Sequence, residues 1–214
     1  KIRDNLNSCI DAFGKLVDDT KMLSDAAVQG DFMKRANAER HLGDFRKVIE
    51  GVNDTLDTVV DKAAWYEAII DAIPLPIQVM NNDMKWAYLN KAFEKLMIEQ
   101  GVITERQASY GMDCCKAGAS ICNTEGCGIR CLVDKGEAET FFEWCGMSNK
   151  QVTAYLKNRR GENVGFVEVV TDLTQIMRVS NYTKTEVRRL EKNLKLLSAG
   201  DLNFDLNIGG ADEY

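Results

Sequence analysis

Three stretches of the chain repeat apolar residues in alternating steps of three and four, and this pattern constrains the fold most strongly. They cover residues 6–27, 42–63 and 176–197. Such a/d spacing is typical of helices that pack against other helices. The seam positions are Leu6, Ile10, Phe13, Val17, Thr20, Ser24 and Ala27; Leu42, Phe45, Ile49, Val52, Leu56, Val59 and Ala63; and Ile176, Ser180, Thr183, Val187, Leu190, Leu194 and Leu197. The sequence therefore predicts three long helices, whose polar seam members weaken the packing.

The first two helices are joined by a connector of about a dozen residues, bounded by Gly30 and Gly43. A glycine commonly ends a helix, and this length allows the two helices to run parallel. The same helix ending occurs twice in the sequence. "AVQGDFMKR" at 27–35 and "LSAGDLNFD" at 197–205 share a Gly-Asp pair after a helix. Internal repetition of this kind predicts that a second copy of the first unit begins near the end of the sequence.

Between the coils, residues 64–174 have the alternation of a sheet domain. "PIQVM" and "KWAYLN" are typical of two strands around a turn, and "KAFEKLMIEQG" of a short helix. "ETFFEWCG", "KQVTAYLKNRRGE" and "NVGFVEVVTDL" follow as three antiparallel strands, with "NRRGE" as the last turn. The sequence predicts an α+β domain built on a five-stranded antiparallel sheet.

Composition excludes several classes of function. The net charge of −6 over 214 residues argues against a nucleic-acid partner. No stretch of 18 uncharged apolar residues is present, so no membrane contact is expected within this sequence. No paired carboxylates or nucleophile–base set stands out, and we expect no enzymatic activity. The sequence starts without Met, which we interpret as a piece of a longer protein.

Five of the seven cysteines lie between Gly111 and Cys131, in "GMDCCKAGASICNTEGCGIRC". They are Cys114, Cys115, Cys122, Cys127 and Cys131. Such crowding in one loop favours a reducing compartment and a metal or redox site over a secreted disulfide framework.

Three chemistries share this spacing. An iron–sulfur cluster, which we favour, needs thiolates on a flexible loop. Zinc needs cysteines at short spacing. A reversible disulfide or sulfenic acid needs one thiol of lowered pKa, and the positive charge of Lys116 or Arg130 could lower the pKa of a neighbouring cysteine. Adjacent cysteines cannot easily bind one ion, so the candidate metal ligands are Cys114, Cys122, Cys127 and Cys131. The fourth reading has all five cysteines simply lining a pocket.

The remaining cysteines and the single histidine are assigned structural roles. Cys145 is expected in the sheet core, Cys9 in packing or at the surface, and His41 at a solvated helix end. The sheet region contains no histidine and the sequence no Cys-x-x-Cys-His, so haem is not expected.

The segment Asn5–Asp61, with its Gly-Asp connector and "HLGDFRKVIEGVNDTLDTVV", resembles a HAMP domain. "YLNKAFEKL" and "GENVGFVEVVTDLT" resemble the second strand, following helix and last strand of a PAS domain, ending in Asp172 and Thr174. The order resembles the cytoplasmic HAMP–PAS–HAMP region of methyl-accepting chemotaxis proteins, and "SICNTEGCGIRCL" resembles a cysteine-containing subclass of their PAS domains. The implied domains are a HAMP domain at 1–62, a PAS domain at 63–175, and a signalling helix with half of a second HAMP domain at 176–214.

What this resemblance implies is a sensory relay. HAMP units of this family are parallel four-helix homodimers, so the partners expected are a second copy, a downstream signalling domain and a small-molecule ligand. The PAS domain would sense redox state or a ligand through loop 111–131, and Asp172 and Thr174 would couple it to the helix that follows. The expected location is the cytoplasmic part of an inner-membrane receptor. The alternatives are the regulatory region of a histidine kinase or diguanylate cyclase, or a PAS module that only mediates dimerisation.

Overall fold

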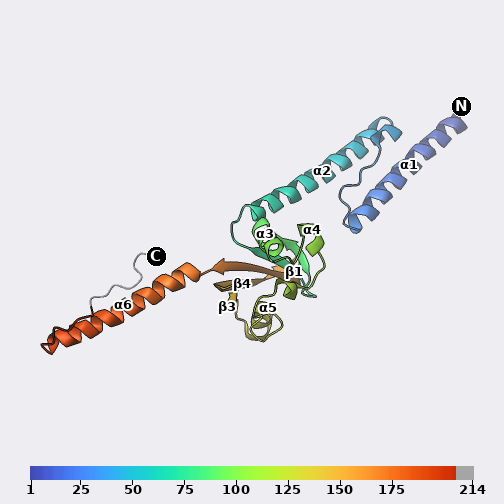
Figure 1. Ribbon diagram of the computed structural model, residues 1–214. Helices are drawn as coiled ribbons and strands as arrows, with labels where there is room; N and C mark the ends of the chain where they lie inside the picture. The colour runs from blue at the N-terminus through green and yellow to red at the C-terminus, as the bar shows by residue number, and fades with distance from the viewer. Residues whose placement is uncertain (206–214) are drawn as a thin grey trace. The chain divides into compact units, whose positions relative to one another are not determined.

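The computed structural model describes residues 1–205 and divides into two compact units, Lys1–Ile70 and a second unit that begins at Asp71. The first unit holds helix α1 (Ile2–Val28) and most of helix α2 (Asp44–Asp71), with a short 3-10 turn η1 (Ala38–Arg40) in the connector. The two helices run in the same direction, because the connector returns along them (Figure 1). Helix α2 continues through the boundary expected at 62/63.

The connector of the first unit is held against helix α2. Asn53 forms two hydrogen bonds with the backbone of Ala36, at 2.9 and 3.1 Å. Ile49 and Leu23 are buried beside Ala36, and half-buried apolar side chains complete this small core. The face of α1 that packs here therefore lies one position away from its predicted seam.

The predicted seam of α1 is exposed in the single chain. Leu6, Ile10 and Phe13 are each more than half exposed, and Val17 nearly so. Burying such a stripe requires another surface, because apolar a/d positions are stabilised by a facing helix. The seam thus remains available to a second chain.

The expectation that His41 is solvated is wrong. His41 and Asp19 are 3% and 4% exposed, and His41 Nε2 lies 2.7 Å from Asp19 Oδ2. Arg40 forms an ion pair with the other oxygen of the Asp19 carboxylate at 3.0 Å. The connector folds back over α1 and covers the imidazole, a tertiary contact that position along a helix does not reveal.

The second unit contains the predicted five-stranded antiparallel sheet, with strand order β2-β1-β5-β4-β3. The strands are β1 (Ile77–Asn81), β2 (Trp86–Leu89), β3 (Glu139–Trp144), β4 (Met147–Lys157) and β5 (Asn163–Asp172). The hairpin β1–β2 joins the rest of the sheet where β1 pairs with β5. Gly165 allows the two backbones to approach closely, since a Cβ at this position would lie 2.1 Å from the Met80 carbonyl oxygen. The expected α+β class is confirmed.

Short helical segments cover one face of this sheet. They are α3 (Lys91–Glu99), α4 (Arg106–Ser109), η2 (Cys114–Ala117), α5 (Gly128–Arg130) and the π-turn η3 (Cys131–Lys135). The long helix α6 (Thr174–Ser198) then follows directly from β5 (Figure 1). The covered face carries the core, which includes Met80, Trp86, Phe93, Phe142 and Trp144.

The β3–β4 and β4–β5 hairpin turns follow from local residue chemistry. Asn158 Oδ1 accepts hydrogen bonds from the backbone N–H of Arg160 and Glu162, so "NRRGE" forms the predicted β4–β5 turn. The β3–β4 turn is Cys145–Gly146, with φ of +54° and +73°. Cys145 is therefore exposed in a turn and not in the core as expected, because two positive φ values are what a two-residue hairpin demands.

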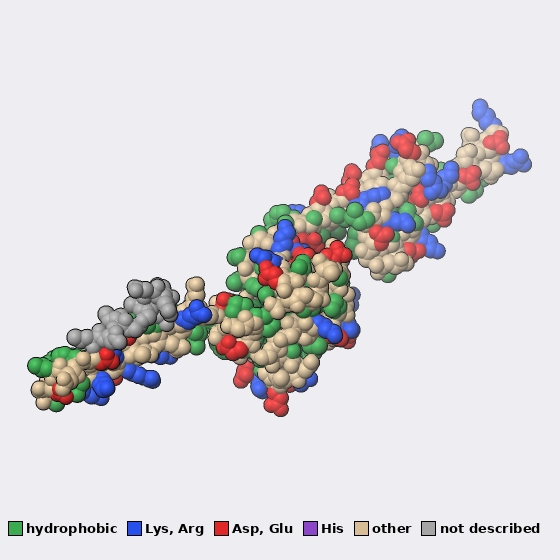
Figure 2. Space-filling view, in the orientation of Figure 1, with side chains coloured by type: hydrophobic (Ala, Val, Ile, Leu, Met, Phe, Trp, Pro, Cys, Tyr) green, Lys and Arg blue, Asp and Glu red, His purple; other side chains and the backbone are tan. Residues whose placement is uncertain are grey.

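Acidic and basic side chains are interspersed on the face shown in Figure 2. No large patch of one sign is visible there. This face offers no extended basic surface of the kind that follows a nucleic-acid backbone.

Candidate functional site

The loop Gly111–Cys131 lies across the covered face of the sheet and is fixed at its start. Gly111 and Met112 form 2.8 Å backbone hydrogen bonds with Trp86, and the Cys114 N–H donates to the Met84 carbonyl at 2.9 Å. Further on, Trp144 Nε1 donates to the Ala117 carbonyl at 3.2 Å. These contacts hold the first half of the loop over the sheet.

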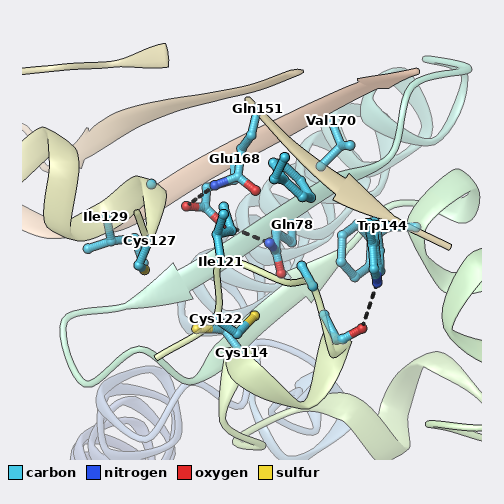
Figure 3. A pocket seen from close by; sticks show the side chains of 15 residues that line it. Gln78, Cys114, Ile121, Cys122, Cys127, Ile129, Trp144, Gln151, Glu168 and Val170 are labelled. Atoms are coloured by element: carbon cyan, nitrogen blue, oxygen red, sulfur yellow. Dashed lines mark hydrogen bonds between the residues drawn. The ribbon is translucent and has the colours of Figure 1, made fainter. Parts of the chain in front are cut away.

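A cavity of about 30 Å³ lies between this loop and the sheet (Figure 3). Its lining combines thiols, polar side chains and apolar walls: Gln78, Phe93, Cys114, Ala117, Ala119, Ile121, Cys122, Cys127, Gly128, Ile129, Phe142, Trp144, Gln151, Glu168 and Val170. A volume of this size holds about one or two water molecules. In this conformation the cavity has no room for a flavin or a haem.

The five loop cysteines separate into two groups. Cys114, Cys122 and Cys127 line the cavity, and Cys115 lies close enough to influence the first two electrostatically. Cys131 is buried outside the cavity lining, and its Sγ donates to the Glu125 carbonyl at 3.4 Å. Three of the four predicted metal ligands therefore share one cavity.

Two of the cavity thiols, those of Cys114 and Cys122, are held in their protonated form. Burial raises the pKa of Cys114 to about 12, and the negative charge of Glu168 acts in the same direction. Burial also raises the pKa of Cys122. Because the thiolate is the nucleophile and metal ligand, these two cysteines are poor redox nucleophiles while the loop is closed.

The described residues 1–205 contain no group of three or more His, Cys, Asp or Glu side chains placed as a metal site. The sulfur donors suit iron–sulfur or zinc chemistry. Binding by Cys114, Cys122 and Cys127 would require their side chains to move together and lose their protons. Iron–sulfur binding and zinc binding stay predictions.

Glu168 is the functional candidate that sequence reasoning missed. It is 4% exposed on β5 and forms the polar floor of the cavity. Oε2 accepts from Gln78 Nε2 at 2.7 Å, and Oε1 accepts from Gln151 Nε2 at 2.7 Å and from Thr153 Oγ1 at 3.1 Å. Burial raises its pKa to about 7, despite the hydrogen bonds from Thr153 and Gln78 that lower it.

A sequence signal for this floor exists. Gln78, Gln151, Thr153 and Glu168 occupy inward positions of strands, where alternation predicts apolar residues. Four polar residues at such positions indicate a buried network, since buried polar groups are nearly always hydrogen-bonded. Which of them meet depends on the β4–β5 register, in which Thr153 stands opposite Glu168.

Gly128 brings the loop down onto this floor. A Cβ at this position would lie 2.2 Å from Gln151 Nε2, 2.5 Å from Thr153 Oγ1 and 2.9 Å from Glu168 Oε1. Only a residue without a side chain allows the backbone to approach so closely. The loop and the polar floor are thus in direct van der Waals contact at Gly128.

Asp172 and Thr174, the predicted coupling residues, join the sheet to α6. Asp172 Oδ1 accepts from the Thr174 backbone N–H at 2.8 Å, and Thr174 Oγ1 accepts from the Ser148 N–H at 3.1 Å. Leu173 N–H donates to the Ser148 carbonyl at 2.7 Å. Hydrogen bonding to Thr174 lowers the pKa of Asp172. The first turn of α6 is therefore bonded to the start of β4.

A second junction binds the incoming chain to the domain. Asp71, the last residue of α2, accepts from Arg106, Tyr88 and the Lys91 N–H at 2.9–3.1 Å. Arg106 also pairs with Glu94 at 3.0 Å and is only 12% exposed. Burial would raise the pKa of Asp71, but the hydrogen bonds from Tyr88 and Arg106 outweigh it and lower the pKa.

Comparison with known proteins gives one family match. Residues 40–73 match the HAMP domain, a range that contains the whole of α2. No curated protein sequence matches this chain. No helix in the described part of the chain has both the length and the apolar character needed to cross a membrane.

Several solved structures resemble the chain at low identity. The PAS domain of a protein from Colwellia psychrerythraea is 14% identical (TM-score 0.39; 55% of this chain, 98% of that one). The PAS domain of Bordetella pertussis BvgS is 16% identical (0.37; 60% and 98%). The photoactive yellow protein domain of the sensor histidine kinase Ppr from Rhodospirillum centenum is 15% identical (0.37; 49% and 91%).

The second unit has the five-stranded antiparallel α+β fold expected for a PAS-type domain, and residues 40–73 are similar to a HAMP domain.

Proposed function

We propose that this chain is the signal-transduction region of a transmembrane chemoreceptor, in which the PAS-type domain senses a small ligand or redox state and biases the helices around it. The observation that carries this proposal is the course of β5. Its residues Glu168 and Val170 line the cavity, and Asp172, two residues on, bonds the start of α6. A change in the cavity therefore has a continuous strand through which to reach the helix.

The cavity supports ligand sensing more strongly than thiol switching. A pocket with apolar walls and a few convergent polar groups is the usual form of a small-molecule site. The raised thiol pKa values of Cys114 and Cys122 disfavour thiolate chemistry in this conformation. An iron–sulfur cluster remains our proposed cofactor for an opened loop, with zinc or a disulfide as its alternatives.

The exposed seams support a homodimer. Helix α6 leaves Val187, Leu190, Leu194 and Leu197 at least half exposed, and α1 does the same with its own seam. Parallel pairing of two copies would bury both stripes. We further propose that the chain lies on the cytoplasmic side of the membrane, contacts neither lipid nor nucleic acid, passes its signal to a downstream domain of the same protein, and has no enzymatic activity.

Anaerobic purification followed by a visible spectrum and metal analysis tests the sensing chemistry. A broad absorption band with bound iron and sulfide would establish the cluster. If the protein is colourless and contains no metal, the proposed cofactor is wrong. If ligands still alter α6 in that protein, the ligand-sensing proposal holds. Equal helix packing under every ligand and redox condition would instead favour a dimerisation scaffold. A histidine kinase or diguanylate cyclase region is the alternative, and the sequence that follows in the full-length protein separates these classes.

A further inference from the structure

Above pH 7, where Glu168 is ionised, the cavity carries a negative charge that no cation in its walls balances. Glu168 is the acidic residue in its lining, and no Lys, Arg or His lines it. Within residues 1–205, the hydrogen-bond partners of the Glu168 carboxyl group are Gln78, Gln151 and Thr153, all neutral. A buried carboxylate without a cation is costly. Positive charge brought by a ligand would be stabilised here.

Hydrogen-bonding capacity points to the same kind of ligand. The amide N–H groups of Gln78 and Gln151 and the hydroxyl of Thr153 already donate to Glu168. The carboxylate has lone pairs beyond these three bonds, and thiol sulfurs are weak acceptors. What the floor offers to a ligand is therefore mainly acceptors, which a ligand with N–H donors would satisfy.

Size and walls restrict the ligand further. The volume of about 30 Å³ admits only a compact molecule of very few heavy atoms. Ile121, Ile129 and Val170 provide apolar walls suited to a methyl group. A metal ion would need several ligands placed around it, and residues 1–205 hold no such group. An ammonium group needs only acceptors and a counter-charge.

We propose that this cavity binds a compact protonated amine of about the size of methylammonium, with Glu168 as its counter-charge and hydrogen-bond acceptor. This inference rests on the proposed sensing function, whose ligand class it names. Bound there, the amine contacts β5 and the loop segment at Gly128 together, because both border Glu168.

The test is an NMR titration of the chain with methylammonium chloride at about pH 8, where Glu168 is ionised, with sodium chloride matched throughout. We expect saturable shifts at the amides of Gly128, Glu168 and Val170. Methanol, which has no charge, and tetramethylammonium, which has no N–H, should give no saturable shift. The Glu168→Gln variant should bind at least about tenfold more weakly, whereas Glu162→Gln, at an exposed turn position outside the lining, should bind as the wild type does.

Saturation of the wild type by methanol or tetramethylammonium, or equal binding by Glu168→Gln, would overturn the proposal. So would zinc chloride saturating the same amides when methylammonium does not. If Glu168→Gln fails to fold, the titrations of the wild type with methylammonium, methanol and tetramethylammonium decide whether the proposal holds. Failure of the amine to bind, with α6 still responding to the cavity substitution Gly128→Ala, would remove this inference and leave the proposed function intact.

Discussion

Glu168 and Asp172 lie on the same face of strand β5, four residues apart, one at the cavity and the other at the start of helix α6. Side chains on a strand alternate, so positions 168, 170 and 172 share that face. Val170, which is buried, lies between Glu168 and Asp172 on this face of β5. The cavity and the outgoing helix are thereby joined without an intervening loop.

Replacing Asp172 with Ala should loosen the first turn of α6. The substitution removes the acceptor for the Thr174 N–H, an interaction worth about 1 kcal/mol in comparable caps. Because the pKa of Asp172 is lowered on folding, this contribution is present at neutral pH and is lost as pH falls below about 4. Helicity measured by circular dichroism should fall slightly at pH 7. Equal wild-type and variant stability at pH 7 and at pH 3 would contradict this account.

Gly128→Ala should destabilise the domain, whereas Gly126→Ala should be tolerated. A Cβ at Gly128 would overlap Gln151 and Thr153, which forces the loop away from the floor at a cost of about 1–3 kcal/mol. A Cβ at Gly126 meets its nearest neighbour at 3.4 Å. Chemical denaturation of the two variants measures the difference. Similar stabilities would show that the loop does not rest on the floor.

Stability should fall with rising pH because of Glu168. Its folded pKa of about 7 lies above its ordinary value of 4.5, so between these values the unfolded chain releases a proton that the folded chain retains. The loss reaches about 3 kcal/mol above pH 7 and is absent below pH 4.5. Relative to Glu168→Gln, the wild type should lose stability over this range.

The measurement is the free energy of unfolding of both proteins from pH 4.5 to pH 8. Glu162→Gln, at an exposed position in the β4–β5 turn, is the matched control and should follow the wild type. Parallel profiles for wild type and Glu168→Gln would mean that Glu168 ionises as freely in the folded domain as in the unfolded chain.

Asp71 and Arg106 should show strong energetic coupling. Both side chains are nearly buried, at 13% and 12% exposure, so removing one takes from the other a charged partner that water does not readily replace. A double-mutant cycle with Asp71→Asn and Arg106→Gln should give about 1–3 kcal/mol. The pair Lys85–Asp113, which is about half exposed, should give less than about 1 kcal/mol. Equal coupling energies for the two pairs would exclude a specific role for this junction.

The exposed seam of α6 should hold two copies together. Leu190→Lys and Leu194→Lys place charge in an apolar stripe and should shift the chain toward monomer. Lys192→Glu, between them in sequence but outside the seam, should not. Sedimentation velocity across a concentration series measures this. A monomeric wild type, or dimerisation unaffected by both leucine substitutions, would contradict the homodimer proposal.

Elements with local signals could be predicted from the sequence. Alternation located five strands, and the side chain of Asn158 and the positive φ of Gly161 fixed the β4–β5 hairpin turn. The 3–4 spacing located α2, whose Ile49 is fully buried. These features depend on neighbours in the sequence, which is why pattern alone sufficed.

Features that depend on tertiary pairing could not be predicted. The burial of His41 against Asp19 needs the connector to fold back over α1. The Glu168 floor needs three strands in register, and the Asp71–Arg106 pair joins positions 35 residues apart. The density of cysteines in the sequence indicated the loop, but not which cysteines line the cavity. Only the folded course of the loop places Cys131 against Glu125 and outside the cavity.

The most direct test of the relay measures hydrogen exchange in the first turns of α6, residues 174–180. Wild type is compared with Gly128→Ala, and both are repeated with Asp172→Ala added; exchange in α3 corrects for global stability. We predict that Gly128→Ala changes exchange in α6 when Asp172 is present and has no such effect when Asp172 is absent. An unchanged α6 in Gly128→Ala, or the same change with and without Asp172, would contradict transmission from the cavity through β5.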